Sequence, residues 1–427
     1  MRVTVYGLWH LGCVTVACLA EAGHQVIGLD PDGNLVAGLR RGKAPLHEPG
    51  LDQLISTGLA AGRLAFTADP AEALTDAEVV WVTFDTPVND QDEADVAWLR
   101  ERLERVVGHI RPGSLVLISS QVPAGFTRSL EQEWRGRGLH FGYSPENLRL
   151  GKALEVFRTP DRVVVGVRDA AGRAAVEALL APRHPRIEWM TVESAEMTKH
   201  ALNAFLATSA AFANELARLC EQVGANAKEV ERGLKSDVRI GPRAYLAPGA
   251  AFAGGTLARD LRYLVGFGEH FRVATPLLRG VLTSNEVHTG WVEEKLRRLL
   301  GEVARPVVAI LGLTYKPGTS TLRRSTAVAQ GLRLHQEGVR VQVHDPAVQE
   351  LPDELRQALT LCPSPEEALA GADAALIATE WPQFRGLRAE QFVAAMRRAQ
   401  VIDPNHFLAD VLAGDVRMRY VATGRAA

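Results

Sequence analysis

The fold that this sequence predicts is decided by residues 1–30, which read MRVTVYGLWHLGCVTVACLAEAGHQVIGLD. The segment 2–6 alternates β-branched residues, as a strand does, and ends at Gly7. Apolar residues then recur at helical spacing over 13–22, and Gly23 closes this segment, because glycine is the usual residue just past the end of a helix. The pattern predicts the start of a strand–helix–strand unit.

The turn after the first strand and the end of the next strand, 25–29, indicate a dinucleotide site. Gly7 and Gly12 allow a tight turn, and the N-terminus of the helix offers free N–H groups to a pyrophosphate. Asp30 follows Gly12 by 18 residues, where a carboxylate can accept from both ribose hydroxyls and would repel a 2′-phosphate. NAD is therefore favoured over NADP. Trp9 stands where a glycine normally lets the backbone approach the pyrophosphate, so a structural turn without a ligand is the alternative interpretation.

Later parts of the first half repeat this alternation of strand and helix. The apolar runs 79–84 and 115–119 are each followed by a turn with proline. Short buried strands separated by helical stretches predict a parallel sheet with helices on both faces. We expect an NAD-binding Rossmann-like domain over residues 1–192.

The middle of the chain has a different pattern. Apolar residues keep helical spacing from 193 to 224, and a second long helix is expected over 275–300, which begins with a cap-like threonine and a proline. Helices of this length normally need a partner, within a bundle or in a dimer. We expect a central helical dimerisation domain at 193–303.

Strand-like runs return in the last part of the chain, at 307–315, 339–345, 374–379 and 401–403. They predict a second Rossmann-like domain at 304–427, which lacks a GxGxxG motif. The fold class expected is therefore α/β, with two Rossmann-like doubly wound parallel sheets joined by a long-helix central region.

Composition narrows the class of protein. The chain has 427 residues, with 48 Lys plus Arg against 50 Asp plus Glu, a formal charge of −2 that gives no basic footprint for nucleic acid or a membrane surface. No apolar run reaches the length of a membrane span, and the N-terminus runs straight into a strand without a signal peptide. The four cysteines form no CxxC pair and no metal spacing. We expect a cytoplasmic protein without a metal, a nucleic-acid partner or a membrane partner.

Nine short segments follow one another along the chain. They are HEPGLDQLI (47–55), SQVPAG (120–125), YSPENLRLGKAL (143–154), PDRVVVG (160–166), SAEMTKHALNAFLAT (194–208), RIGP (239–242), PGAAFAGGTLARD (248–260), YKPGT (315–319) and TEWPQF (379–384). Their order and spacing resemble the UDP-glucose/GDP-mannose dehydrogenase family of nucleotide-sugar oxidoreductases over essentially the whole chain.

This resemblance implies an activity and an assembly. Family members oxidise a primary alcohol on a nucleotide-linked hexose to a carboxylate with two NAD molecules and four electrons. The resemblance implies a homodimer formed through the helical core, a UDP-sugar as the substrate, with guanine as the alternative base, and a place in polysaccharide biosynthesis.

Four catalytic positions can be carried over. Removal of hydride from an alcohol needs a group that takes the hydroxyl proton and a donor that stabilises the oxygen. Lys199 and Asn203 are four residues apart, so they share one helix face, and they match the lysine and asparagine that hold the reacting oxygen. Asp260 matches an aspartate that can accept a proton. Glu146 matches a candidate base for water attack on an acyl intermediate. Taken without the family, a solvated helix face is the ordinary explanation of such a Lys/Asn pair.

The resemblance also implies two sets of binding residues. The cofactor set comprises Gly7, Trp9, His10, Leu11, Gly12, Asp30, Thr86, Ser120, Gln121 and Arg323. The substrate set comprises Glu146, Leu148, Arg149, Lys199, Asn203, Arg239, Phe252, Gly254, Gly255, Tyr315 and Lys316. Arg239 would reach substrate across a dimer interface, and Lys316 suits a diphosphate as a point charge. Each single Arg or Lys could also be an ordinary surface charge.

The sequence departs from the family pattern at chemically important positions. Thr256 stands where the family has its nucleophilic cysteine. Gln121 replaces a threonine, Leu150 a second glutamate, and Asn405 an arginine. There is also one extra residue between the RIGP segment and the glycine pair of FAGGTLARD.

Thr256 bears on how many oxidations take place. A cysteine has a reference pKa of about 8.5, so a few per cent is thiolate at neutral pH, whereas a threonine hydroxyl needs a dedicated base. We therefore expect a single two-electron oxidation. The alternatives are a full four-electron dehydrogenase that forms a uronic acid without a cysteine, and a catalytically silent homologue that binds a nucleotide sugar.

Overall fold

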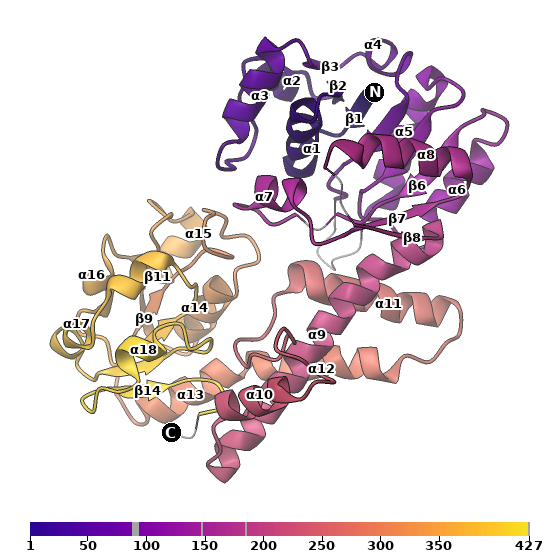
Figure 1. The fold of residues 1–427 in the computed structure, drawn as a ribbon. Helices are drawn as coiled ribbons and strands as arrows, with labels where there is room; N and C mark the ends of the chain where they lie inside the picture. The colour runs from indigo at the N-terminus through magenta and orange to yellow at the C-terminus, as the bar shows by residue number, and fades with distance from the viewer. Residues whose placement is uncertain (88–93, 147, 184–185, 426–427) are drawn as a thin grey trace. The chain divides into compact units, whose positions relative to one another are not determined.

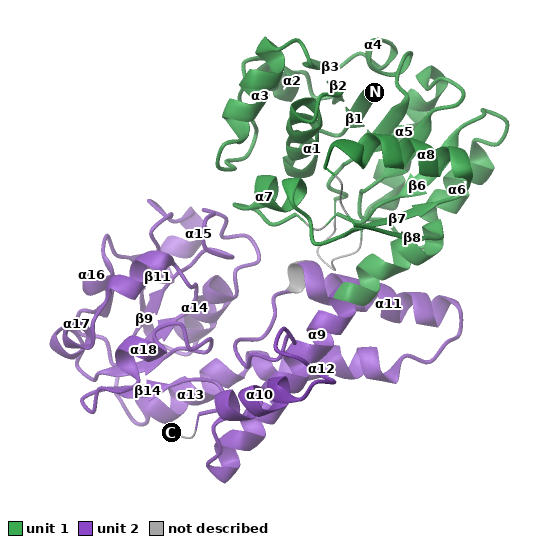
Figure 2. Ribbon diagram, viewed as in Figure 1, with its two compact units in different colours: residues 1–202 green, residues 203–427 purple. Residues whose placement is uncertain are grey.

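A computed structural model describes residues 1–87, 94–146, 148–183 and 186–425 of the chain (Figure 1). The chain forms two compact units, Met1–Leu202 and Asn203–Ala427 (Figure 2). Each unit holds one sheet with helices packed on its two faces.

The first unit is built on an eight-stranded sheet with the order β3-β2-β1-β4-β5-β6-β7-β8. Its pairs are parallel, except that β7 runs antiparallel to β6. The strands are β1 (Arg2–Tyr6), β2 (Gln25–Leu29), β3 (Leu64–Thr67), β4 (Val79–Val82), β5 (Leu115–Ile118), β6 (His140–Tyr143), β7 (Val163–Val167) and β8 (Ile187–Met190). The helices are α1 (His10–Glu21), α2 (Gly33–Arg40), α3 (Leu51–Ala60), α4 (Pro70–Leu74), α5 (Val96–Val106), α6 (Phe126–Glu133), α7 (Ala153–Arg158) and α8 (Ala170–Leu180).

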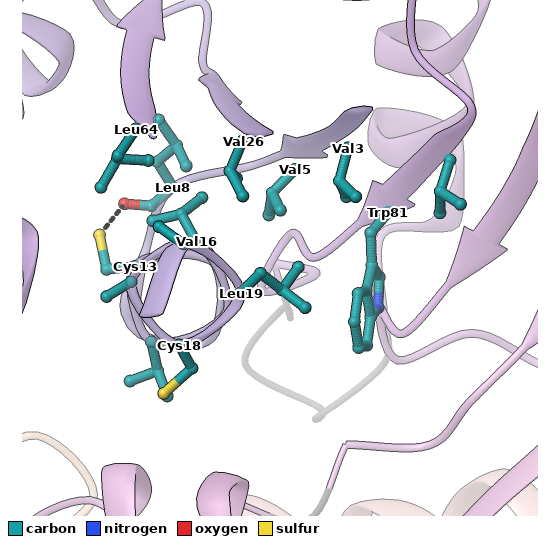
Figure 3. Packing of buried hydrophobic residues seen from close by; sticks show 14 of the residues in the cluster. Val3, Val5, Leu8, Cys13, Val16, Cys18, Leu19, Val26, Leu64 and Trp81 are labelled. Atoms are coloured by element: carbon teal, nitrogen blue, oxygen red, sulfur yellow. Dashed lines mark hydrogen bonds between the residues drawn. The ribbon is translucent and has the colours of Figure 1, made fainter. Parts of the chain in front are cut away.

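Two apolar clusters lie on opposite faces of this sheet. One joins α1, α3, α7 and α8 to the strands, and Figure 3 shows part of it, with side chains of α1 packed beside those of β1, β2, β3 and β4. The other joins α4, α5 and α6 to the same strands. The central strands are buried throughout, which agrees with their nearly continuous apolar sequences.

The second unit contains a six-stranded sheet with the order β11-β10-β9-β12-β13-β14, in which every described pair is parallel. Its strands are β9 (Val307–Leu311), β10 (Arg340–His344), β11 (Leu359–Leu361), β12 (Ala374–Ile377), β13 (Gln400–Ile402) and β14 (Arg419–Val421). The helices around it are α13 (Trp291–Leu300), α14 (Thr326–Gln336), α15 (Asp353–Arg356), α16 (Pro365–Leu369), α17 (Ala389–Ala395) and α18 (Ala409–Leu412). In both sheets the first strand lies beside the fourth, which is the doubly wound Rossmann order.

A long-helix region lies between the two sheets in the sequence. Helix α9 (Val192–Val223) matches the predicted helix within one residue at each end. It is followed by α10 (Ala227–Ser236), the π-helical turn η3 (Gly254–Ala258), α11 (Arg259–His270) and α12 (Pro276–Thr289). The fold class predicted from the sequence is thus confirmed.

One predicted helix is divided. The expected helix over 275–300 begins at Pro276 and ends before Gly301, but Gly290 separates it into α12 and α13. The side chain of Trp291, the next residue, is almost fully buried against the second sheet. The periodicity of the sequence could not reveal this break, because both halves keep helical spacing.

Among the residues that the structure describes, no helix combines the length and apolar character that a membrane crossing requires.

Candidate active site

The turn between β1 and α1 is shaped by two glycines. Gly7 has φ +102°, and a Cβ there would lie 2.8 Å from the ring of Phe84. A Cβ at Gly12 would lie 1.9 Å from the carbonyl oxygen of Gly7. Helix α1 therefore starts in close contact with the turn, and its N-terminal N–H groups stand next to Gly7. This is the cradle that a pyrophosphate needs.

Asp30, at the end of β2, is buried beside this turn. Its Oδ2 accepts from the backbone N–H of Leu8 at 2.7 Å, and its Oδ1 accepts from that of Asp32 at 3.0 Å. Burial raises the pKa of Asp30, although these two hydrogen bonds oppose the effect. A carboxylate offers about four acceptor positions, so two remain for the hydroxyls of a ribose. The residues present therefore fit an adenosine ribose of NAD.

Trp9 does not distort the turn. It occupies the N-cap position of α1 with φ −80° and ψ −154°, a region open to any residue, and its side chain is 44% exposed. The indole is therefore not part of the core of the first unit. A glycine is not required at this position for the backbone conformation that the turn adopts.

His10 has a protein partner. Its Nε2 lies 2.9 Å from Oε2 of Glu48, a buried carboxylate that also accepts from the backbone N–H groups of Gly151 and Ala153. Burial alone would raise the pKa of Glu48, but the hydrogen bonds from His10 and the two amides lower it. His10 thus ties the dinucleotide turn to the HEPG segment. The contact joins residues 38 apart in sequence, so the sequence of the turn alone gives no sign of it.

Leu11, in the first turn of α1, lies near the residues that follow β6. It lines a largely apolar pocket of the first unit together with Trp81, Ser119, Glu146 and Leu148. One expected cofactor residue and two expected substrate residues thus share one pocket wall.

Two further expected cofactor residues follow the ends of β4 and β5. The Thr86 hydroxyl donates to the carbonyl oxygen of Gln121 at 2.9 Å. Ser120 is buried, and its Oγ has no hydrogen-bond partner among the described residues. An orphaned hydroxyl at the carboxyl end of a central strand fits a polar ligand there.

Lys199 and Glu146 contact each other within the first unit. The Lys199 ammonium donates to the main-chain oxygen of Glu146 at 2.5 Å, and the Glu146 carboxylate accepts from the backbone N–H of Leu148. Burial raises the pKa of Glu146, while the charge of Lys199 partly opposes this. The lysine is thereby held at the end of β6 rather than on a solvated helix face.

Two neighbours of Lys199 on α9 were missed by sequence reasoning. The Glu196 carboxylate is fully buried and accepts from the backbone N–H of Gly125 at 2.6 Å and from the backbone and hydroxyl of Thr127. The His200 ring lies 3.0 Å from the carbonyl oxygen of Val122. Both fix α9 to the segment that follows β5. Polar residues at apolar positions of the helix were the available signal.

Asn203 and Asp260 form a buried pair within the second unit. The Asn203 amide nitrogen donates to Oδ2 of Asp260, and both side chains are almost wholly buried.

Thr256 lies four residues before Asp260, in the π-helical turn η3, and is exposed. The main chain of Gly254 and Gly255 forms the start of the same turn. Phe252 leads into it and is held by Asn285, whose amide accepts from its N–H at 2.9 Å and donates to its carbonyl oxygen at 3.0 Å.

The remaining expected substrate and cofactor residues are cations and an aromatic residue outside the core. Arg239 is exposed and pairs with Asp237, with Nη2 and Oδ2 2.7 Å apart. Arg149, Tyr315, Lys316 and Arg323 are also exposed. Within the part of the chain that the structure describes, no contact assigns these side chains to a site, so their roles stay predictions. Among the described residues there is no cluster of three His, Cys, Asp or Glu side chains that could hold a metal.

The fold and these contacts define a class: an α/β protein with a dinucleotide turn and buried polar groups suited to proton and hydride chemistry. Comparison with known proteins gives the family. Models of three domains of the UDP-glucose/GDP-mannose dehydrogenase family match: the NAD binding domain over residues 1–184, the central domain over 193–287 and the UDP binding domain over 309–410. The chain belongs to this family.

Similar proteins cover the whole chain. A UDP-glucose 6-dehydrogenase of Pseudomonas aeruginosa is 35% identical, over 100% of this chain and 98% of that protein. One of Rhizobium meliloti is 32% identical over 100% of both. The solved structure of a UDP-glucose dehydrogenase from Pyrobaculum islandicum superposes with a TM-score of 0.87 at 29% identity, covering 100% of this chain and 98% of that one.

Family membership settles the broad activity. The chain is an NAD-dependent oxidoreductase of the nucleotide-sugar dehydrogenase type, and NAD is its cofactor.

Proposed function

We propose that the chain oxidises a hydroxyl of a UDP-linked hexose to a carbonyl in a two-electron step. The observation that carries the proposal is the buried hydrogen bond between Asn203 and Asp260. Thr256, four residues before Asp260, is exposed and stands at the position of the family cysteine. The groups needed for the first oxidation are present, whereas the nucleophile for a thioester route is not. The names of the relatives make UDP-glucose the first sugar to test.

The proposed division of labour follows from the hydrogen bonds of each group. The Lys199 ammonium has three N–H donors, of which the carbonyl oxygen of Glu146 takes one, so others can stabilise the developing oxyanion. The Asn203 amide nitrogen carries two hydrogens, of which one goes to Asp260, so the second can point to the same oxygen. Asp260 is the proposed acceptor of the hydroxyl proton. Lys199 and Asn203 follow each other by one turn of α9, which supports a shared substrate oxygen.

The proposed cofactor residues are those of the first unit. Gly7 and Gly12 would receive the pyrophosphate, Asp30 the ribose, and Leu11 with Ser120 the reactive end. Bound NAD supplies the acceptor for the hydride that leaves the carbon. The chain contributes orientation and charge, and the overall change converts one alcohol and one NAD into a carbonyl, one NADH and one proton.

Thr256 supports a stop after the first step. Attack on a carbonyl needs a deprotonated hydroxyl, and a threonine reaches that state only with a dedicated base. Thr256 is exposed, and no described hydrogen bond joins its hydroxyl to a base. Glu146, with its raised pKa, would be the base for water attack in the four-electron alternative.

We also propose a homodimer through α9. Phe205, Phe212 and Leu219 recur every seven residues on this helix and are 67%, 51% and 64% exposed. An apolar stripe of this spacing is typical of a helix that packs against another. Arg239, exposed in the single chain, would reach substrate from the partner subunit.

The proposed cytoplasmic location rests on the four free cysteines, three of them buried.

A panel of nucleotide sugars tests the function. The purified chain is mixed with NAD and UDP-glucose, UDP-N-acetylhexosamines or GDP-mannose, and NADH absorbance is followed while the product is identified by mass. We expect a UDP-sugar to give a carbonyl product. A uronic acid as the product would support the four-electron alternative, and no turnover with any sugar, together with no NAD binding at millimolar concentration, would support the silent homologue.

A further inference from the structure

The backbone of residues 249–252 is held by four side chains from three distant parts of the second unit: α9, α12 and the segment after β13. Asn214 of α9 accepts from the N–H of Gly249 at 2.9 Å, and the His288 ring lies 2.8 Å from the carbonyl oxygen of the same residue. Asn405, after β13, accepts from the N–H of Ala250 at 2.7 Å. We call Asn214, Asn285, His288 and Asn405 the loop clamp, with Asn285 holding Phe252 as described above.

The clamp is built for one geometry. A Cβ at Gly249 would lie 2.4 Å from Oδ1 of Asn405, so any larger residue there would displace this amide. Asn214 and His288 are 3% and 5% exposed. Buried polar side chains are costly unless they are hydrogen-bonded, and both of these bond the backbone of Gly249. Asn405 is exposed, and its side chain bonds both the N–H of Ala250 and the side chain of Glu380.

His288 is a neutral donor in this arrangement. Burial lowers the pKa of His288, although the hydrogen bond to Gly249 opposes the effect. Since a carbonyl oxygen can only accept, Nε2 must carry the proton. Nδ1 is buried without a hydrogen-bond partner among the described residues. A side chain with any other neutral N–H at this point could replace it.

Asn405 links the clamp to a departure from the family pattern. Where that pattern has an arginine, this chain has an amide that accepts a backbone hydrogen bond, which an arginine cannot do because it has no acceptor. Ala250 itself lies between the RIGP segment and the glycine pair, where this chain has one extra residue relative to the family pattern. Asn405 bonds the backbone of Ala250, which lies in the segment that the resemblance indicates is one residue longer.

The clamped segment 249–252 adjoins both the η3 turn and a pocket at the second sheet. It leads directly into η3, which carries Thr256 and is followed by Asp260. Ala250, His288 and Asn405 also line a pocket at the carboxyl ends of β12 and β13, where an open α/β sheet normally binds its ligand.

We propose that Asn405 and His288 are positioning residues for the reaction: they fix the segment 249–252 and thereby set both the η3 turn and the wall of the nucleotide pocket. The inference rests on the proposed function and adds to it the device that orients the substrate. Asn405 compensates for the longer segment, so that Asp260 stays in register with Asn203.

Paired substitutions test the proposal. Asn405→Leu and His288→Leu keep the approximate side-chain volume and remove the contact, whereas His288→Gln keeps a neutral N–H donor. We expect both leucine variants to weaken UDP binding and to lower kcat/KM for the sugar by about 10- to 100-fold, with the Kd for NAD changed less than about twofold. His288→Gln should stay within about threefold of the wild type. The matched control is Asn226→Leu, which removes an exposed amide that caps α10 in the same unit.

Two outcomes would overturn the proposal: leucine variants that resemble the control in UDP affinity and kcat/KM, or a His288→Gln variant as impaired as His288→Leu. Hydrogen exchange of the wild-type chain covers the case in which the leucine variants do not fold. The amides of Gly249, Ala250 and Phe252 should be protected, and exchange at the rate of an open loop would contradict the clamp. UDP binding and exchange need no turnover, so failure of the clamp is distinguishable from failure of the proposed oxidation.

Discussion

The two sheets begin with the same turn but use it differently. In the first unit β1 ends just before Gly7, with φ +102°, and in the second β9 ends just before Gly312, with φ +92°. A leucine follows each glycine, and its backbone N–H donates to an aspartate at the end of the next strand: Leu8 to Asp30 and Leu313 to Asp345, both at 2.7 Å. The backbone plan is shared by the two Rossmann sheets.

The two aspartates differ in how many donors the protein supplies. Asp30 accepts from two backbone N–H groups. Oδ2 of Asp345 accepts from the N–H of Leu313, from the N–H and hydroxyl of Thr314 and from the indole of Trp381, and its Oδ1 accepts from the N–H of Ala347. The Asp30 carboxylate keeps acceptor positions for a ligand, whereas protein donors occupy the acceptor positions of Asp345.

The helices that follow the turns differ as well. Helix α1 begins at His10, directly after the turn, so its N-terminus stands where a pyrophosphate can bind. Helix α14 begins at Thr326, after a loop that contains Tyr315 and Lys316. Spare hydrogen-bonding capacity and helix placement, more than the strand order, distinguish the cofactor sheet from its counterpart.

Removal of the Asp345 carboxylate should have the largest effect on stability. Asp345→Ala leaves several buried donors without an acceptor, and we expect it to lower the free energy of unfolding by about 3–5 kcal/mol. Chemical denaturation followed by fluorescence measures this loss. A decrease below about 1 kcal/mol would mean that Asp345 is no more committed to its unit than Asp30.

Alanine at either turn glycine should be similarly damaging. Gly7→Ala meets Phe84, and Gly312→Ala meets the backbone of Thr379 at 2.6 Å, and both positions have positive φ. Each change should lower the free energy of unfolding by more than about 2 kcal/mol. Gly33→Ala, with open space around its Cβ and no positive φ, is the control. Clearly unequal losses of stability at the two turns would contradict the shared backbone plan.

Removal of the open carboxylate should act on the cofactor. Asp30→Ala loses the proposed ribose contacts, and we expect the Kd for NAD to rise by about 10- to 100-fold, with a smaller loss of stability than for Asp345→Ala. Discrimination against NADP should weaken in parallel, because the charge that repels a 2′-phosphate is gone. Calorimetry with both cofactors measures these effects, and unchanged NAD affinity would show that this carboxylate is not the ribose ligand.

The pH dependence of NAD binding should also report on the protonation of Asp30. Burial raises the pKa of Asp30 above its ordinary value of 3.8. The charged, accepting form is present above the raised pKa and is lost as the pH falls through it. NAD affinity should therefore begin to fall at a pH higher than an exposed aspartate would give, and Asp30→Asn should remove that limb. An identical acid limb in Asp30→Asn would assign it to another group.

Trp9 should have the smallest effect. Its backbone already has a conformation open to every residue, so Trp9→Gly should change the Kd for NAD by less than about threefold. A tenfold or greater gain of affinity in this variant would show that the indole obstructs the cofactor.

The sequence predicted what depends on neighbouring residues. The bounds of β1 and β2, the start of α9 and the two doubly wound sheets follow from local alternation of apolar residues and from glycines at the turns. The antiparallel pairing of β7 with β6 did not, because pairing direction is decided between strands rather than within one.

The candidate site divides in the same way. A four-residue spacing placed Lys199 and Asn203 on one helix, but their partners Glu146 and Asp260 lie 53 and 57 residues away. The link between Asn405 and Ala250 spans 155 residues, and no pattern along the chain announces it. Family resemblance supplied candidate roles for such residues, whereas their contacts came from the folded chain.

The most direct measurement is the number of NADH molecules formed for each UDP-sugar consumed at completion, in the wild type and in Thr256→Cys. We predict one for the wild type and a value above one for the cysteine variant, because the added thiol restores the nucleophile for a second oxidation. A clean value of two in the wild type, with a uronic acid as the product, would contradict the account.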